Sequence, residues 1–432
     1  MPDQVLWGAE TKKAIARTPI SGEPIPAPVI HWLGRIKAAA ARVHAELGVL
    51  DSERARRIAA AADRVASGEL DDQFPVDVFQ TGSGTSSNMN ANEVIAALAG
   101  ADVHPNDHVN LGQSSNDVFP SAVHLAALER LERGLLPALE RLAASLGAQA
   151  ERHADVVKAG RTHLMDAVPM TLGQELGGYA AQVRESVRRV RAVLPGLAQI
   201  PLGGTAVGTG MNAHPELGQR VRARLSHDSG LEVRGPANAF EAQGARDGLV
   251  EASGALRSVA VSLGKVANDL RLLGSGPRTG LGEIRLPELQ KGSSVMPGKV
   301  NPVVVEIVTQ VAAQVIGNDQ VVAVAGLQGQ LELNAFVPVM ARNLLQSIEL
   351  LTRAASTFAA DCVDGLEVDV ERCTANAELT LATAAALNPV VGYERAEAIV
   401  REASRSGRTL REVALQMGVP EEAVERALGP RG

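Results

Sequence analysis

The chain has 432 residues, of which 45% are hydrophobic and 21% are charged, so we expect a packed globular protein of two or three domains. Its formal net charge of −7 argues against nonspecific binding of nucleic acid or of an anionic membrane surface. Only two cysteines occur, Cys362 and Cys373, no leader sequence opens the chain and no apolar run could cross a bilayer, so we expect a cytoplasmic protein without a membrane partner.

Residues 1–112 combine short helical patterns with loops. Pro24, Pro26 and Pro28 interrupt the pattern early, and a polar, glycine-rich segment follows at Thr81–Asn92. We expect an N-terminal, mostly helical domain over this range.

Residues 113–366 differ in kind, because apolar residues recur there at steps of three, four or seven. Each stripe is sustained over about three heptads or more, which predicts helices roughly 30–40 Å long. Pro137 lies inside the first stripe and should kink that helix. Aromatic residues make up only 2% of the chain, so small side chains must form the seams of a long helix bundle. The stripes run over Leu125–Leu146, Leu172–Leu194, Leu249–Leu270 and Leu344–Cys362.

The long helices carry apolar positions beyond a single stripe, which favours a bundle shared between subunits, although a monomeric bundle is an alternative. From residue 367 to residue 432 the pattern shortens, and Pro389 and Gly392 interrupt it. This range predicts a small C-terminal helical domain.

Four polar segments rich in hydroxyls, amides and glycine interrupt the helical pattern. Hydroxyl and amide groups beside the N–H groups of a helix start can hold a carboxylate. For any one segment alone, ordinary helix capping by Ser, Thr or Asn is the favoured interpretation. Four together, with a histidine and a lysine among them, favour an anion-binding active site. The segments are Thr81–Asn90, Gln113–Asp117, Gly160–His163 and Gly292–Pro302.

The fourth segment contains the residue types of an acid–base site. Lys299 and Asn301 offer one charge and one amide to a carboxylate, and Ser293 or Ser294 could act as a base if it were deprotonated. Glu306, on the helix expected to follow, could orient a histidine. Dinucleotide, phosphate-loop and zinc-protease motifs are missing from the sequence. His104 and His108 are better interpreted as loop histidines than as metal ligands, so the residues predict a site for a multi-carboxylate ligand without a metal or cofactor.

Residues Gly292–Pro302 resemble the signature loop of the fumarase/aspartase superfamily, and the other three segments resemble its conserved regions in the same order. Within that superfamily the chain looks most like class II fumarases, particularly actinobacterial ones. The resemblance implies an all-α, three-domain fold and a homotetramer with a central twenty-helix core and active sites each built from three chains. It also implies reversible hydration of fumarate to L-malate in the tricarboxylic acid cycle, by anti elimination through an aci-carboxylate. The regions that carry this likeness are Thr81–Ala96, His104–Pro120, Gly160–Glu175 and Ala237–Ala255.

Roles for individual residues follow from the same resemblance. Ser293 would remove the C3 proton of malate, and His163 would act through a bound water while paired with Glu306. Lys299 and Asn301 would hold the substrate carboxylate. Further substrate contacts would come from Ser83, Thr85, Ser114, Ser115, Asn116 and Thr162, and a second dicarboxylate site near the entrance from His104, Asn106 and Asp107.

Some positions depart from the usual fumarase pattern. Leu286–Leu289 and Gln330–Asn334 read partly like aspartases, and the N-terminus is shorter. The elimination chemistry stays the same, but the leaving group could be water, ammonia or a substituted amine. A non-catalytic binding protein on the same scaffold is the remaining alternative.

Overall fold

The computed structural model describes residues 5–290, 292 and 294–428. In these residues the secondary structure is predominantly α-helical, with short strands that form two-stranded antiparallel sheets. The all-α expectation is therefore confirmed, and the strands serve as local connections. No helix in the described part of the chain is long and apolar enough to cross a membrane.

The chain forms two compact units, each assembled from three separate stretches. Unit 1 comprises Met1–Ala138, Ser186–Val261 and Gln310–Arg353, and unit 2 comprises Leu139–Glu185, Ser262–Thr309 and Ala354–Gly432. The division into three domains at residues 112 and 366 stays a prediction.

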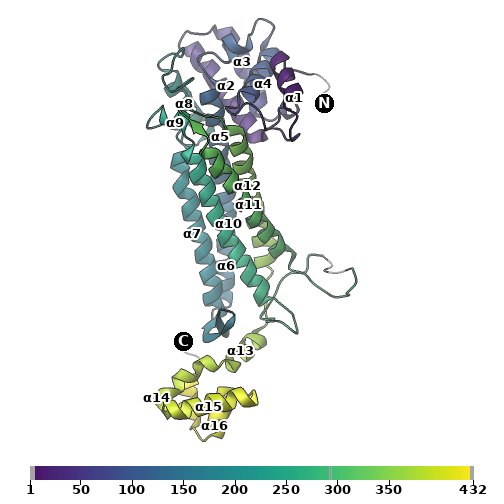
Figure 1. The fold of residues 1–432 in the computed structure, drawn as a ribbon, viewed down its shortest axis with the longest axis vertical. Helices are drawn as coiled ribbons and strands as arrows, with labels where there is room; N and C mark the ends of the chain where they lie inside the picture. The colour runs from purple at the N-terminus through teal and green to yellow at the C-terminus, as the bar shows by residue number, and fades with distance from the viewer. Residues whose placement is uncertain (1–4, 291, 293, 429–432) are drawn as a thin grey trace. The chain divides into compact units, whose positions relative to one another are not determined.

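The N-terminal helices of unit 1 pack closely on one another (Figure 1). A Cβ atom on Gly34 of α2 would lie 2.6 Å from the backbone nitrogen of Ala66 on α3, so glycine permits this approach. The alanines Ala38–Ala41 of α2 are buried, which keeps that helix close to its neighbours. The helices of this group are α1 (Ala9–Arg17), α2 (Ala27–Glu46), α3 (Ser52–Ala66), α4 (Thr85–Ala99), α5 (Ser115–Arg130), α8 (Leu217–Ser229) and α9 (Glu241–Gly244), with the short turns η1 (Asp71–Gln73) and η2 (Pro105–Val109).

Glu93 of α4 holds the start of α1. Its carboxylate accepts hydrogen bonds from the N–H groups of Gly8, Glu10 and Thr11 and from the Thr11 hydroxyl. These are donors that the first turn of a helix leaves without a partner, and a negative charge there is also favoured by the helix dipole. A side chain 82 residues away along the chain therefore caps α1.

Long helices occupy each of the four predicted stripes, which confirms the periodicity. In unit 1, Asp319 of α11 accepts hydrogen bonds from Ser253 and Arg257 of α10, and Asn318 donates to Gln346 of α12. These polar contacts fix the register of the three helices. The long helices are α6 (Leu136–Arg152), α7 (Leu172–Leu197), α10 (Asp247–Leu273), α11 (Val303–Gly326) and α12 (Val337–Phe358), which the π-helical turn η4 (Ala359–Val363) extends.

The break expected at Pro137 lies a few residues earlier. The π-helical turn η3 (Leu131–Leu135) separates α5 from α6, and the N–H of Leu136 donates to the carbonyl of Leu131. Pro137 is the second residue of α6, where a missing N–H costs little. The proline is accommodated because the wider turn precedes it.

Unit 2 contains the hairpin of β1 (Val157–Thr162) and β2 (Met165–Thr171) and the sheet of β3 (Ile284–Arg285) with β6 (Glu367–Val368). Its C-terminal helices enclose a small apolar core that includes Leu387, Ile399, Val413 and Val424. These helices are α13 (Val370–Leu379), α14 (Asn388–Val391), α15 (Tyr393–Ser406), α16 (Leu410–Gln416) and α17 (Glu421–Leu428), with the 3₁₀ segment η5 (Leu381–Leu387). The third sheet, β4 (Gly329–Gln330) with β5 (Leu333–Asn334), belongs to unit 1.

Candidate functional site

Two helices of unit 1, α4 and α5, begin next to each other. Gly84 precedes α4 with φ of 76°, and a Cβ atom there would lie 2.2 Å from the ring of Phe119 on α5. Only glycine combines that backbone conformation with so close a contact. The start of α4 is therefore held directly against the first turns of α5.

A chain of hydroxyl groups joins these two helix starts. The Ser83 and Thr85 hydroxyl oxygens lie 2.8 Å apart, and those of Thr85 and Ser115 also lie 2.8 Å apart. Helix N-termini present N–H groups without helical partners and the positive end of the helix dipole. Three of the predicted substrate contacts thus come together at a place suited to an anion.

Ser114 has the capping role that the sequence left open. Its hydroxyl accepts the N–H of Asn116, while the Asp117 carboxylate accepts the N–H of Ser114, so the two form a capping box. The side-chain amide of Asn116 donates to the carbonyl of Ala206, 2.9 Å away. Ser114 and Asn116 therefore lie at the same helix start as Ser115, but both are engaged within the protein.

Two buried charged groups near the start of α5, Asp117 and Lys37, were given no role in the sequence analysis. Asp117 accepts N–H groups from Gly203 and Thr205, and burial raises the pKa of Asp117 to about 6. Burial lowers the pKa of Lys37 to about 7, against the opposing attraction of Asp117. The Lys37 ammonium donates to the side-chain oxygen of Gln113, 3.4 Å away. Gln113 directly precedes Ser114, the first residue of the capping box. A lysine in an alanine-rich, otherwise apolar stretch of α2 is the signal that could have revealed it.

The residues predicted for the second dicarboxylate site share one exposed turn. His104 precedes the π-helical turn η2, and its Nδ1 atom accepts the N–H of Asp107 at 3.1 Å. Asn106 lies between them and is exposed. Their binding role stays a prediction. Among the described residues, no three His, Cys, Asp or Glu side chains are placed to hold a metal ion.

In unit 2, Thr162 is the last residue of β1, and His163 begins the two-residue turn of the β1–β2 hairpin. Thr162 pairs with Met165, and the two residues between them, His163 and Leu164, have φ of 55° and 60°. Two-residue hairpin turns commonly need positive φ at both positions, which is why Asn-Gly is usual there. The sequence analysis did not predict this hairpin, because neither His163 nor Leu164 gives a turn signal in the sequence.

The predicted signature loop closes on itself at its two ends. The N–H of Gly292 donates to the carbonyl of Lys299, and the Asn301 amide donates to the carbonyl of Gly292. A Cβ atom on Gly292 would lie 2.2 Å from the Lys299 carbonyl oxygen, so glycine is needed for this closure. Lys299 is exposed, and Glu306 lies in the first turn of α11, as expected. Ser293 lies outside the described residues.

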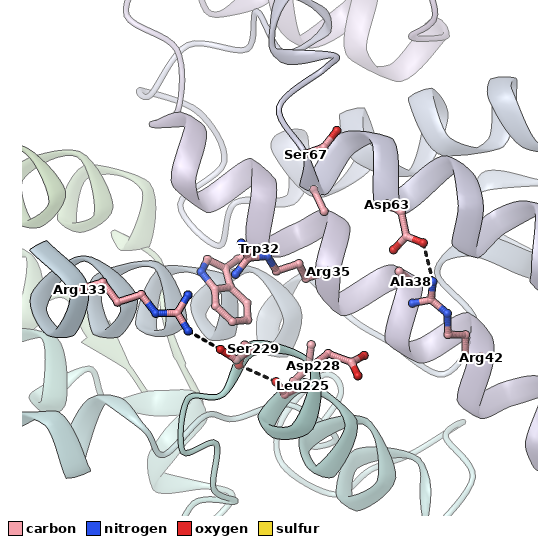
Figure 2. A pocket seen from close by; sticks show the side chains of 11 residues that line it. Trp32, Arg35, Ala38, Arg42, Asp63, Ser67, Arg133, Leu225, Asp228 and Ser229 are labelled. Carbon is pink, nitrogen blue, oxygen red and sulfur yellow. Dashed lines mark hydrogen bonds and ion pairs between the residues drawn. The ribbon is translucent and has the colours of Figure 1, made fainter.

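Unit 1 also contains a cavity of about 330 Å³, shown in Figure 2. Its guanidinium groups are paired: Arg35 with Glu129, Arg42 with Asp63, and Arg133 with Glu129 and the Ser229 carbonyl. Positive and negative charges balance there, which does not suit a dianion. Among the described residues, none of those predicted for the site lines this cavity.

Comparisons with known proteins agree with the resemblance seen in the four polar segments. A family profile described as a lyase matches residues 1–317, and one described as the fumarase C C-terminus matches residues 383–432. The chain is 54% identical over 423 residues to a class II fumarate hydratase of Mycobacterium tuberculosis, covering 97% of this chain and 89% of that protein. A Corynebacterium glutamicum protein of the same name is 53% identical with the same coverage.

Among solved structures, recombinant class II fumarase from Schistosoma mansoni superposes with a TM-score of 0.94 at 35% identity, covering 99% of this chain and 96% of that one. Both the sequence of nearly the whole chain and its fold therefore match one group of proteins. The chain belongs to the class II fumarate hydratase family.

Proposed function

We propose that the chain is a fumarate hydratase, which interconverts fumarate and L-malate. The observation that carries this proposal is the hydroxyl chain of Ser83, Thr85 and Ser115 across the adjoining starts of α4 and α5. It offers a carboxylate several donors and two helix dipoles in a part of the chain that matches the family.

Removal of the C3 proton of malate places a second negative charge on the neighbouring carboxylate, giving an aci-carboxylate. Such a group needs donors and a cation arranged in advance. In the proposed site, helix starts and Asn301 supply the donors and Lys299 the cation. Ser293 takes the C3 proton, and His163, oriented by Glu306, protonates the leaving hydroxide through a water. No hydride or electron is transferred, so the proposal needs no redox cofactor.

The proposed active form is a homotetramer in which three chains build each site. Support comes from α11, which carries exposed apolar side chains at Ile307, Ile316, Val321 and Val324. Such residues on a long helix are typical of helices that pack against another chain. Thr162, His163, Lys299 and Asn301 of one chain can then act with the hydroxyl groups of another. We place the reaction in the cytoplasm, since Cys362 and Cys373 are free and buried.

Ammonia and substituted amines are not favoured as leaving groups. The relatives that match nearly the whole chain are named class II fumarate hydratases, although Leu286–Leu289 and Gln330–Asn334 read partly like aspartases.

The test is fumarate absorbance with the purified protein in chelating buffer, given L-malate and, separately, L-aspartate. We expect fumarate to form from malate and not from aspartate. Fumarate from aspartate alone would make the protein an aspartase, and no reaction with either would favour substituted succinates or a non-catalytic scaffold.

A further inference from the structure

Unit 2 contains a buried cluster of charges to which no role has been assigned, although one member, Arg161, lies in the predicted segment Gly160–His163. The Glu283 side chain has no exposed surface, and that of Lys158 is 1% exposed. The Arg161 guanidinium makes two contacts with the Glu283 carboxylate, at 2.6 and 3.1 Å. Lys158 lies 3.4 Å from Glu283 and 3.2 Å from Glu175. The two-contact Arg161–Glu283 pair is the most directional part of this cluster.

Glu283 is fixed in place by several elements of unit 2. Its N–H donates to the carbonyl of Leu273 at the end of α10, and its carbonyl accepts the N–H of Asp369. Its carboxylate also accepts the amide of Asn376 on α13, 3.0 Å away. Burial would raise the pKa of Glu283, but hydrogen bonds from Arg161 and Asn376 and the charge of Lys158 hold the pKa below its ordinary value. Glu283 is therefore a charged and rigidly placed acceptor.

Arg161 is close in sequence to the turn that presents His163. The pairing of β1 with β2 is irregular between Ala159 and Arg161, and bulges of this kind redirect the side chains around them. The next residues lead into His163 and Leu164, whose φ values of 55° and 60° lie in the left-handed region, which is strained for residues other than glycine. Such strain persists only where the surroundings enforce it.

Within one chain, packing contributes little to holding this turn. His163 is exposed, and the side chains of Leu164 and Met165 are 70% and 69% exposed. The described contacts that constrain the hairpin include the strand pairing, the hydrogen bond from the Thr380 hydroxyl to the Ala167 carbonyl and the anchored Arg161 side chain. We propose that Glu283 is a positioning residue: by clamping Arg161 it fixes the strained His163–Leu164 turn and so places the imidazole of His163. This inference rests on the proposed function, which gives His163 its part in proton transfer.

The first variants are Glu283→Gln, which removes the charge at similar size, and Arg161→Lys, which keeps the charge but loses the planar fork. We expect each to lower kcat about ten- to a hundredfold while KM changes little, because displacement of a catalytic group by about 1 Å has effects of that size. Arg161→Lys keeps the test available if Glu283→Gln does not fold.

Lys158→Met is the matched control. It disturbs the same buried cluster but leaves both contacts between Arg161 and Glu283, so we expect lower thermal stability with an unchanged kcat. A loss of kcat as large as that of Glu283→Gln would reduce the cluster to a structural role and overturn the proposal.

The double variant of Glu283→Gln with His163→Asn separates positioning from an independent effect. If Glu283 acts through His163, the double variant should be no slower than His163→Asn alone. Multiplied losses would contradict the proposal. An inactive wild-type protein would instead refute the proposed function, so the two failures are distinguishable.

Discussion

In the proposed mechanism Ser293 is the base that takes the C3 proton of malate, and Ser294, the next residue in the sequence, provides a matched control. We expect Ser293→Ala to lower kcat by about two orders of magnitude or more, since proton abstraction by a positioned base contributes on that scale. Ser294→Ala should retain most activity. The measurement is steady-state kinetics with malate, together with size-exclusion chromatography to check assembly. Equal losses in both variants would remove the specific assignment to Ser293.

His124 of α5 makes unit 1 sensitive to acid. Burial lowers the pKa of His124 from 6.5 to about 4, and the charge of Arg246 acts in the same direction. The unfolded chain therefore takes up a proton at higher pH than the folded chain. The stability linked to neutral His124 is present above about pH 6.5 and is lost as the pH falls towards 4, at most about 3 kcal/mol.

We expect His124→Gln to reduce the fall in melting temperature between pH 6.5 and pH 4. Asp117 has the opposite effect on stability. Because its pKa is raised, its protonation at lower pH removes a buried charge from the folded state and so adds to stability. The matched control is His227→Gln, whose parent side chain is 88% exposed. Parallel melting curves for wild type and His124→Gln across this pH range would show that protonation of His124 does not limit acid stability.

At the scale of elements, the junction of α4 and α5 depends on Gly84. An alanine there would face both a positive φ and the Phe119 ring at 2.2 Å. We expect Gly84→Ala to raise KM for malate and lower the melting temperature, because the two helix starts must separate. Gly48→Ala is the matched control, since its φ is also positive at 68° but no atom lies within 4 Å of the added Cβ. It should show only the backbone cost, about 1–2 kcal/mol. Equal effects of both variants on KM would contradict a role for the close contact.

How much could be predicted differs between these elements for physical reasons. Four long helices followed from apolar stripes, because each buries one face. Helix α11 showed no such stripe, since Val, Ile and Ala occur around most of its circumference. The hairpin turn at His163 was missed because its positive φ values are imposed from outside and leave no Asn-Gly signature. The contact of Glu283 with Arg161 could not be predicted either, because the hydrogen-bond partners of Glu283, Arg161 and Asn376, are 122 and 93 residues away along the chain.

The candidate site was predictable as a set of residues but not as an arrangement. Ser83, Thr85 and Ser115 were identified from their segments, yet only the fold shows that their hydroxyl groups form one chain. Ser114 was assigned to substrate, whereas its hydroxyl caps α5 in the structure. A polar residue at a helix start can cap the helix or bind a ligand, and sequence alone does not separate the two.

At the scale of the whole molecule, α11 combines a polar contact inward with apolar side chains outward. Asp319 and Asn318 bond to α10 and α12, while Val324 is 55% exposed and Ile316 is 38% exposed. If α11 lies in the core of a tetramer, a charge at Val324 is buried without a partner on assembly, which costs several kcal/mol at each copy.

We therefore expect Val324→Arg to shift the protein from tetramers to smaller species, as measured by light scattering coupled to size-exclusion chromatography. Activity should fall as the fraction of tetramer falls, because each proposed site needs three chains. The helical signal in circular dichroism should be retained. Val370→Arg is the matched control, since Val370 is 50% exposed on the C-terminal helix α13 and should tolerate the charge. A Val324→Arg protein that remained tetrameric and active would place α11 outside the subunit interface, and one that became monomeric yet stayed active would mean that a single chain holds a complete site.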